Sequence, residues 1–121
     1  MKKTEEHHRR PESLGGTDLP SNVSYVQRRL HECWHTLFGN MNSEQVANEI
    51  NMSLWKPEGV TVVCRFINGT EVTFRGEHNS KKVGKREKAW SVLFNNMRFQ
   101  EAINYINSVW LDPSYHLYVV K

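Results

Sequence analysis

One stretch of the chain contains residue types that could bind a metal ion and activate water. Residues 31–35 read His-Glu-Cys-Trp-His, which places two imidazoles four residues apart with a carboxylate beside the first. Residues at i and i+4 share one face of a helix, so both rings could bind one zinc ion while Glu32 acts as a general base. The spacing makes His31, Glu32 and His35 candidates for a metal site.

Other features of this stretch favour a structural interpretation. Arg28 and Arg29 stand where zinc peptidases with this pattern normally carry uncharged residues, and no third histidine follows at the spacing of the longer zinc-peptidase patterns. The candidates for a third ligand are Glu49, on a short predicted helix, and Glu58, in a Pro-Gly loop. We therefore predict no metal ligands and interpret the two histidines as flanking a buried apolar stripe, with a zinc site as the alternative.

Other catalytic patterns are missing from the sequence. There is no glycine-rich phosphate loop, no G-x-S-x-G nucleophile elbow and no paired-carboxylate motif. The two cysteines, Cys33 and Cys64, form no C-x-x-C pair and fall on apolar stripes, which predicts reduced, partly buried thiols with a structural role. We therefore expect neither an enzyme nor a cofactor.

The basic side chains are concentrated in one segment. The 121 residues include 16 Lys and Arg against 13 Asp and Glu, a net charge of +3. Residues 75–88 hold six basic and two acidic side chains, a net +4, so the rest of the chain sums to −1. Such a local patch is typical of a polyanion contact, and an ordinary solvated helix start is the alternative.

Hydrophobic periodicity predicts the elements that must position these residues. Residues 1–20 contain few large apolar side chains and several glycines and prolines, so we expect a disordered tail, followed by a single α+β domain over 21–121. The order α-α-β-β-α-α-β, without an internal repeat, predicts a small, mostly antiparallel sheet with helices packed on one face. The expected helices span 26–38, 43–54, 80–97 and 99–111, and the expected strands span 60–67, 70–75 and 115–120.

Local signals predict how some of these elements begin and how two strands connect. Ser24 with Gln27 could form a capping box for the first helix, and Ser80 could cap the third. Asn68 and Gly69 are typical of a type I′ turn, which would join strands 60–67 and 70–75 as a hairpin.

This hairpin and the basic segment after it resemble part of a known family. The stretch GEHNSKKVGKREKAWSVL, residues 76–93, is similar to the carboxy-terminal half of the double-stranded RNA-binding domain. The resemblance covers about residues 60–94 and implies a central part with that domain's fold, in which lysines contact phosphates of an A-form duplex. The matching residues are Gly76, Ser80, Lys81, Lys82, Lys85, Ala89 and Leu93.

These signals predict a binding protein, with two possible partners. Free N–H groups and lysines at a helix start favour anions, so we expect a nucleic-acid-binding protein whose ligand is structured or double-stranded RNA. The alternative is a regulatory or adaptor protein that binds another protein through Trp55, Tyr115 and Tyr118. The residues expected to contact nucleic acid are His78, Asn79, Ser80, Lys81, Lys82, Lys85, Arg86 and Lys88.

The sequence also bears on where the protein works. No apolar run reaches the roughly 20 residues that cross a bilayer, and the first 13 residues are charged where a secretory signal would be apolar. We therefore expect a cytoplasmic protein with no membrane partner.

Overall fold

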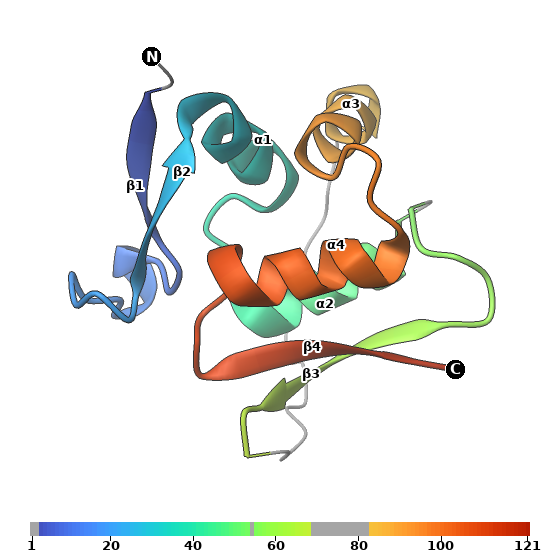
Figure 1. The fold of residues 1–121 in the computed structure, drawn as a ribbon. Coiled ribbons are helices and arrows are strands. Elements are labelled where there is room, and N and C mark those ends of the chain that lie inside the picture. Colours follow the sequence, from blue (N-terminus) through green and yellow to red (C-terminus); the bar gives the residue numbers. More distant parts are fainter. Residues whose placement is uncertain (1–2, 54, 69–82) are drawn as a thin grey trace.

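The computed structural model describes residues 3–53, 55–68 and 83–121. This part of the chain is an α+β structure with four α-helices and two antiparallel two-stranded sheets (Figure 1). The predicted α+β class is therefore confirmed. The segment that resembles the double-stranded RNA-binding domain spans about residues 60–94. Residues 69–82 of this segment, which follow its first strand, lie outside the described residues.

The amino-terminal residues form a strand where a disordered tail is predicted. Strand β1 (Thr4–His8) pairs antiparallel with β2 (Val23–Gln27), and a short 3-10 turn, η1 (Glu12–Leu14), lies between them. Asn22 is buried, and its side chain accepts from the backbone N–H of Arg10 and donates to the carbonyls of Arg10 and Thr17. Buried hydrogen bonds rather than apolar side chains order this segment, so the predicted tail is wrong here.

The first helix starts later than its apolar periodicity suggests. Helix α1 (Arg28–Phe38) follows β2 directly, without a side-chain cap. Ser24 lies in β2, where its hydroxyl donates to the carbonyl of Val109 at 2.8 Å, so the predicted capping box is wrong. Helix α2 (Ser43–Asn51) does begin with a capping box, formed by Asn42 and Gln45.

The carboxy-terminal half adds two helices and completes a second strand pair. Helix α3 (Val83–Leu93) is followed by α4 (Phe99–Tyr105), which continues into a π-helical turn, η2 (Ile106–Trp110). Strand β3 (Thr61–Phe66) pairs antiparallel with β4 (Tyr115–Val120). These elements confirm four predicted ones, whereas the predicted strand 70–75 and Gly69 of its turn lie outside the described residues.

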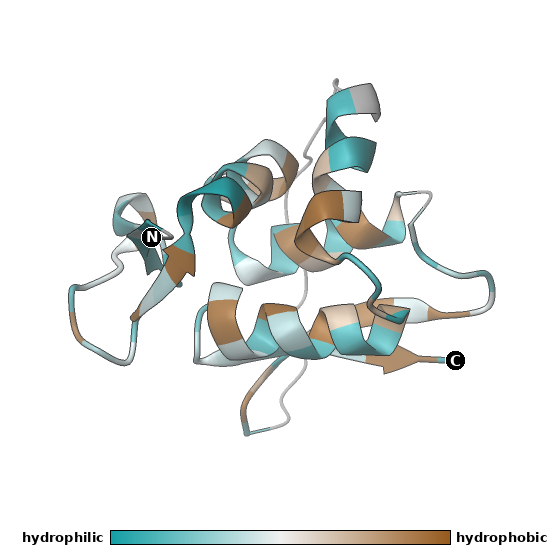
Figure 2. Cartoon of the chain, turned by 45° about the horizontal axis from the view of Figure 1, so that its top comes forward, coloured by the Kyte–Doolittle hydropathy of each residue, from teal (hydrophilic) through white to brown (hydrophobic). Residues whose placement is uncertain are grey.

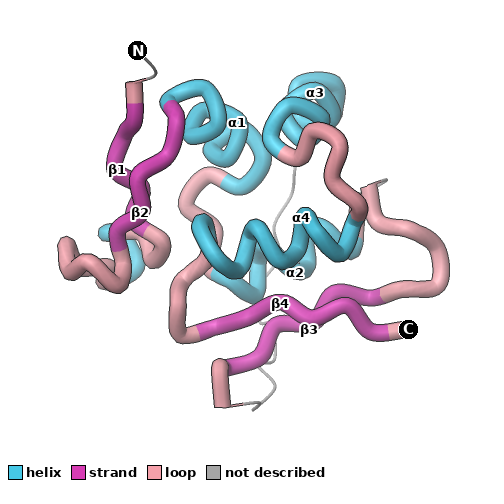
Figure 3. The backbone as a smooth tube through the Cα atoms, in the orientation of Figure 1, coloured by secondary structure: helices cyan, strands magenta, loops and turns pink. Residues whose placement is uncertain are grey.

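The helices are stacked on one side of the β3–β4 ribbon. Helices α2 and α4 lie next to the ribbon, α1 and α3 lie beyond them, and the β1–β2 hairpin flanks α1 (Figures 1 and 3). Apolar residues concentrate on the helix faces that meet in the middle (Figure 2). As predicted, Trp34 and Trp110 are core residues, whereas Trp90, predicted to be one too, is partly buried at the core's edge. The largest fully buried side chains include Trp110, Phe38, Leu37, Ile50 and Ile103.

The helices and the β3–β4 ribbon form two copies of one α-α-β unit, α1–α2–β3 and α3–α4–β4. In each unit the second helix packs on that unit's strand, while α1 packs on α3 and β3 pairs with β4. Residues 34–51 align without gaps with residues 90–107, and the prediction of no internal repeat is therefore wrong. Eight aligned pairs are identical: Trp34/Trp90, Leu37/Leu93, Phe38/Phe94, Asn40/Asn96, Met41/Met97, Asn48/Asn104, Ile50/Ile106 and Asn51/Asn107.

The tryptophan packing repeats between the two units. Trp34 stacks on Trp110 with ring centres 5.1 Å apart and planes 13° apart. Its counterpart Trp90 stacks on Trp55 at 4.6 Å and 14°. Each stack joins the first helix of one unit to the segment after the second helix of the other unit. The two units are therefore interlocked around an approximate twofold axis.

An asparagine at each edge of the β3–β4 ribbon also repeats. The side chain of Asn51 bonds both the N–H and the carbonyl of Val62, and the side chain of Asn107 bonds both groups of Leu117, all at 2.7 to 2.9 Å. At these positions the amide replaces a neighbouring strand and covers the open edge. The repeat therefore extends from the helices into the strands, where loops of different length shift the alignment.

Candidate metal centre

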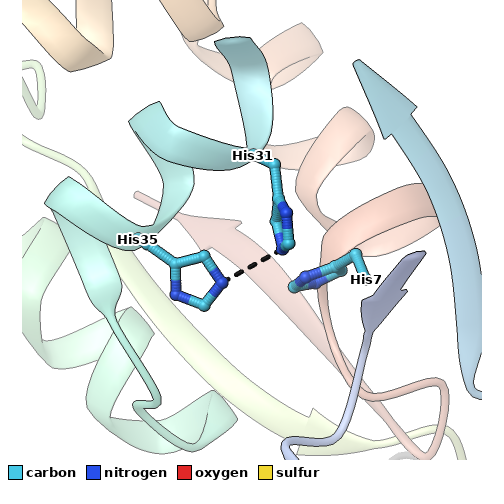
Figure 4. A group of neighbouring side chains, drawn as sticks. All are labelled: His7, His31 and His35. Atoms are coloured by element: carbon cyan, nitrogen blue, oxygen red, sulfur yellow. Dashed lines mark hydrogen bonds between the residues drawn. The ribbon is translucent and has the colours of Figure 1, made fainter. Parts of the chain in front are cut away.

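Three histidines from two elements meet at one point (Figure 4). His7 comes from β1, whereas His31 and His35 lie four residues apart on one face of α1, and one ring nitrogen of each lies within 4.8 Å of the other two. Nε2 of His31 and Nε2 of His35 are 3.0 Å apart. Two nitrogens about 2.0 to 2.1 Å from a tetrahedral ion lie about 3.3 Å apart, so this pair is close to ligand spacing.

Neighbouring acceptors orient two of the three rings. Nε2 of His7 lies 2.8 Å from the carbonyl oxygen of Trp110, and Nδ1 of His31 lies 3.0 Å from Oε1 of Glu5. Each acceptor takes the ring N–H on one side and leaves a lone pair on the other nitrogen for a metal. Nδ1 of His7 and Nε2 of His31 would therefore be the atoms that bind a metal ion.

Burial keeps these rings in the form that binds metal. Desolvation lowers the pKa of His7 to about 4, against the opposing hydrogen bond to Trp110, and the neighbouring imidazoles and Arg9 lower it further. Burial also lowers the pKa of His35. Both rings are neutral at pH 7, and metal binding there does not have to displace a proton.

The metal-free protein should lose stability as the pH falls from about 6.5 to about 4. In this window the unfolded chain binds a proton at His7 that the folded chain excludes, so the free energy of unfolding rises with pH. The shift from 6.5 to about 4 corresponds to about 3 kcal/mol. Urea unfolding with a chelator at pH 7, 5.5 and 4 measures this change. His7→Gln should remove about that much of the pH dependence, and equal slopes in parent and variant would contradict the assignment.

His8, the next residue of β1, lines the same cavity of about 440 Å³ as the three rings. Nε2 of His8 lies 2.7 Å from Oδ1 of Asp18 and 3.3 Å from Oε1 of Glu12. The hydrogen bond to Asp18 raises the pKa of His8. Because the carboxylate holds the Nε2 proton, Nδ1 is the nitrogen that can accept one, as in an Asp–His pair that acts as a general base.

Glu32, the carboxylate of the H-E-x-x-H pattern, does not take part in this centre. Its side chain is 67% exposed, with Oε1 3.4 Å from Nε of Arg28, and it does not line the cavity. The general base that this pattern predicts is therefore not in place, which argues against peptide hydrolysis by the zinc-peptidase route.

The third nitrogen donor is one that the sequence analysis does not include. Of the two carboxylates considered, Glu49 is buried in an ion pair with Arg86 and Glu58 lies in an exposed turn. The interpretation of His31 and His35 as residues that merely flank the core is therefore incomplete, since both face His7. The signal that could have found His7 is the pair of adjacent histidines in Thr4–His8, within the segment predicted to be disordered.

The structure separates the residues predicted to contact nucleic acid. Lys85 and Lys88 are exposed on α3. The guanidinium of Arg86 is nearly buried, pairs with Glu49 and lies 5.1 Å from the ring centre of Trp55, so the expectation that Arg86 contacts nucleic acid is wrong. A buried carboxylate needs such a partner, which fixes this arginine inside the fold. Outside the described residues lie His78, Asn79, Ser80, Lys81 and Lys82.

The cysteines and the proposed aromatic surface are also placed. Burial raises the pKa of Cys64 to about 12 and raises that of Cys33, which fits structural thiols. Of the aromatic residues, Tyr118 is exposed beneath Arg65, whereas Trp55 is half-buried against the core.

Comparisons with known proteins complete the description of the site. No protein-family model, curated protein or solved structure matches the chain. Among the described residues, no helix is both long and apolar enough to cross a bilayer.

Proposed function

We propose that this protein is a metal-dependent hydrolase that cleaves phosphodiester bonds of nucleic acid. The observation that carries the proposal is the convergence of His7, His31 and His35 in a cavity that His8 also lines, with Asp18 bonded to His8 outside it. Three imidazoles leave a position of a tetrahedral ion open for water or substrate, as catalytic rather than structural sites do. Imidazole ligands favour zinc and related transition ions over magnesium.

The His8–Asp18 pair can supply the proton transfer from water that a hydrolysis needs. His8 takes a proton from water as the water oxygen forms a bond to phosphorus, and the bond from phosphorus to one ester oxygen breaks. The departing oxygen takes its proton from solvent. Asp18 holds the His8 ring and stabilises the imidazolium that forms. A cation held by the three histidines would supply positive charge opposite the phosphate oxygens.

Charges of both signs line the cavity, Arg9 and Arg10 against Glu6, Glu12, Glu44 and Asp112. The support for a phosphodiester therefore comes from Arg10 and from the basic segment outside the cavity. Arg10 lines the cavity and is half exposed, with Nε 3.7 Å from Oδ2 of Asp112. Lys85 and Lys88 add exposed positive charge on α3, within the segment that predicts a polyanion contact. The position of Glu32 disfavours the peptidase reading of the same histidines.

This proposal keeps the ligand that the sequence predicts and departs from the expectation of a protein without catalysis. The three-histidine group, which depends on residues far apart in the chain, is the reason for that change. The adaptor alternative has less support, because Trp55 stacks on Trp90 and both contribute to the packing of the core.

Cleavage assays with metal-free protein test the proposal. Supercoiled plasmid, duplex RNA and single strands of each are incubated with protein and added Zn²⁺, Ni²⁺, Mn²⁺ or Mg²⁺. We expect cleavage with Zn²⁺ or another transition ion, its loss in EDTA and its recovery when the ion is restored. Protein that holds its metal yet cleaves none of these substrates would contradict the hydrolase assignment.

Replacing the two exposed lysines of α3 should weaken nucleic-acid binding in a salt-dependent way. Each phosphate contact contributes about 0.9 to the slope of log affinity against log salt for a B-form duplex. Lys85→Ala with Lys88→Ala should therefore reduce the slope by up to about 1.8. Fluorescence anisotropy from 50 to 200 mM salt measures it, with Lys121→Ala, at an exposed lysine after β4, as the control. An unchanged slope would place the contact away from α3.

A further inference from the structure

The two α-α-β units differ at the positions that hold the metal ligands. In the alignment of the units, His31 and His35 of α1 correspond to Glu87 and Ser91 of α3. Ser91 donates its hydroxyl to the carbonyl of Glu87 at 3.1 Å, a bond common on helix surfaces. The second unit therefore repeats the packing of the first without its pair of imidazoles.

The second unit nevertheless contributes to the site of the first. The β1–β2 hairpin docks on the end of η2, where the wider π-helical turn leaves backbone carbonyls available. Arg9, His7 and Ser24 all donate to these carbonyls, at 2.5 to 2.8 Å. The acceptors are the carbonyl oxygens of Asn107, Val109, Trp110 and Leu111.

These bonds set the position of His7 relative to α1. The carbonyl of Trp110 fixes which nitrogen of His7 is free for a metal, and the Trp110 ring lies 4.9 Å from the His7 ring. The same carbonyls form the negative end of the helix, which favours both the Arg9 cation and a metal ion nearby. The metal centre of the first unit is thus incomplete without the second.

A different group covers the second tryptophan stack, that of Trp90 on Trp55. Trp55, the counterpart of Trp110, is covered by Arg86, whose partner is the buried Glu49. One half therefore has a metal ligand against its tryptophan stack, and the other half has an ion pair. The approximate twofold symmetry of the scaffold is broken at the site itself.

We infer that the second unit is a built-in partner subunit that carries no metal, so that the protein acts as a monomer with one metal centre. Contacts between the units, α1 with α3 and β3 with β4, are already made within one chain. In symmetric nucleic-acid-binding dimers, the twofold axis places equivalent residues of the two subunits at the two half-sites of a duplex. The expected product rests on the proposed function: a single centre cuts one strand of a duplex in each encounter and leaves a nick.

Mass and metal content test the single-centre monomer without reference to catalysis. Light scattering on the eluting protein should give the mass of one chain, 14.2 kDa. Competition with a chromophoric zinc chelator should give one tightly bound Zn²⁺ per chain. A stable dimer, or a second tight Zn²⁺ per chain that remains when His8→Ala disrupts the separate His8–Glu12–Asp18 group, would overturn the inference.

The role of the second unit in holding the hairpin has its own test. Arg9→Met removes the two bonds to the carbonyls of Leu111 and Asn107 that hold the strand of His7, so it should lower zinc affinity several-fold although Arg9 contacts none of the three histidines. Arg65→Met, a matched change on the far strand, should leave zinc affinity unchanged. Equal affinities in the two variants would contradict the role of these carbonyls.

A plasmid time course tests the one-strand product. Supercoiled plasmid should convert almost completely to the open-circular form before linear plasmid appears. Linear product that forms directly from supercoiled plasmid would overturn one-strand cleavage. If the protein is a monomer with one metal ion but cleaves nothing, the proposed function and the predicted nicked product are both wrong. Whether the second unit is a metal-free partner is decided by mass and metal content alone.

Discussion

His8→Ala should lower the rate of phosphodiester cleavage by about 10²- to 10⁴-fold and leave zinc affinity nearly unchanged. His8 lines the same cavity as the three convergent histidines but is not one of them, and Asp18 fixes its ring. Single-turnover cleavage with zinc-loaded protein measures the rate, and chelator competition measures the affinity. His116→Ala is the matched control, because His116 lies on β4 and does not line this cavity.

The pH dependence of the rate distinguishes a general base from a structural role for His8. Only the neutral ring accepts a proton, so the rate should rise with pH as His8 loses its proton. Because Asp18 raises the pKa of His8 above 6.5, Asp18→Asn should move this inflection to lower pH. A parent profile without an inflection that responds to Asp18→Asn would argue against His8 as the base.

Replacing any one of the three convergent histidines by alanine should lower zinc affinity by more than about 100-fold. The reason is that a direct ligand contributes more than the groups that orient it, whose loss typically costs 10- to 100-fold. Glu5→Gln tests the weaker class, because Glu5 only orients His31. In chelator competition, zinc affinity should therefore be highest in the parent and lower in Glu5→Gln. It should be lowest in His7→Ala, His31→Ala and His35→Ala.

Two other outcomes of this competition would contradict the three-histidine centre. If His7→Ala bound zinc as tightly as the parent while His35→Ala did not, the third ligand would come from elsewhere. If none of the three variants lost affinity, these rings would be the core-flanking residues that the sequence analysis favours.

Apolar periodicity predicts the helices well, because burial is what holds them. Leu37 and Phe38 of α1, Ile103 of α4 and Ile106 of η2 recur at helical spacing, and all four are buried. The start of α1 is missed because Ser24 bonds to Val109, which is 85 residues away. Contacts over such distances leave no periodic trace in the sequence.

Half of the metal centre can be predicted from the sequence, and the other half cannot. The spacing of His31 and His35 identifies two donors, since one helix places them on the same face. His7 joins them only because β1 is held by polar bonds to Trp110 and to the loop around Asn22. A composition-based argument predicts disorder there, since it counts apolar side chains and not buried hydrogen bonds.

The internal repeat shows how divergence can hide a pattern. Trp34 and Trp90 head two stretches with the same order of apolar residues, but the site residues His31 and Glu87 differ in charge and chemistry. The stacks that these tryptophans make on Trp110 and Trp55 identify the two units as copies.

Zinc K-edge X-ray absorption of protein loaded with one equivalent of Zn²⁺ tests the central claim most directly. Three histidines predict imidazole nitrogens at about 2.0 to 2.1 Å with one further oxygen, and no sulfur at about 2.3 Å. His7→Ala should lose one imidazole from this shell, because His7 is one of the three convergent rings. A shell with sulfur from Cys33, or one that His7→Ala leaves intact, would contradict the three-histidine centre.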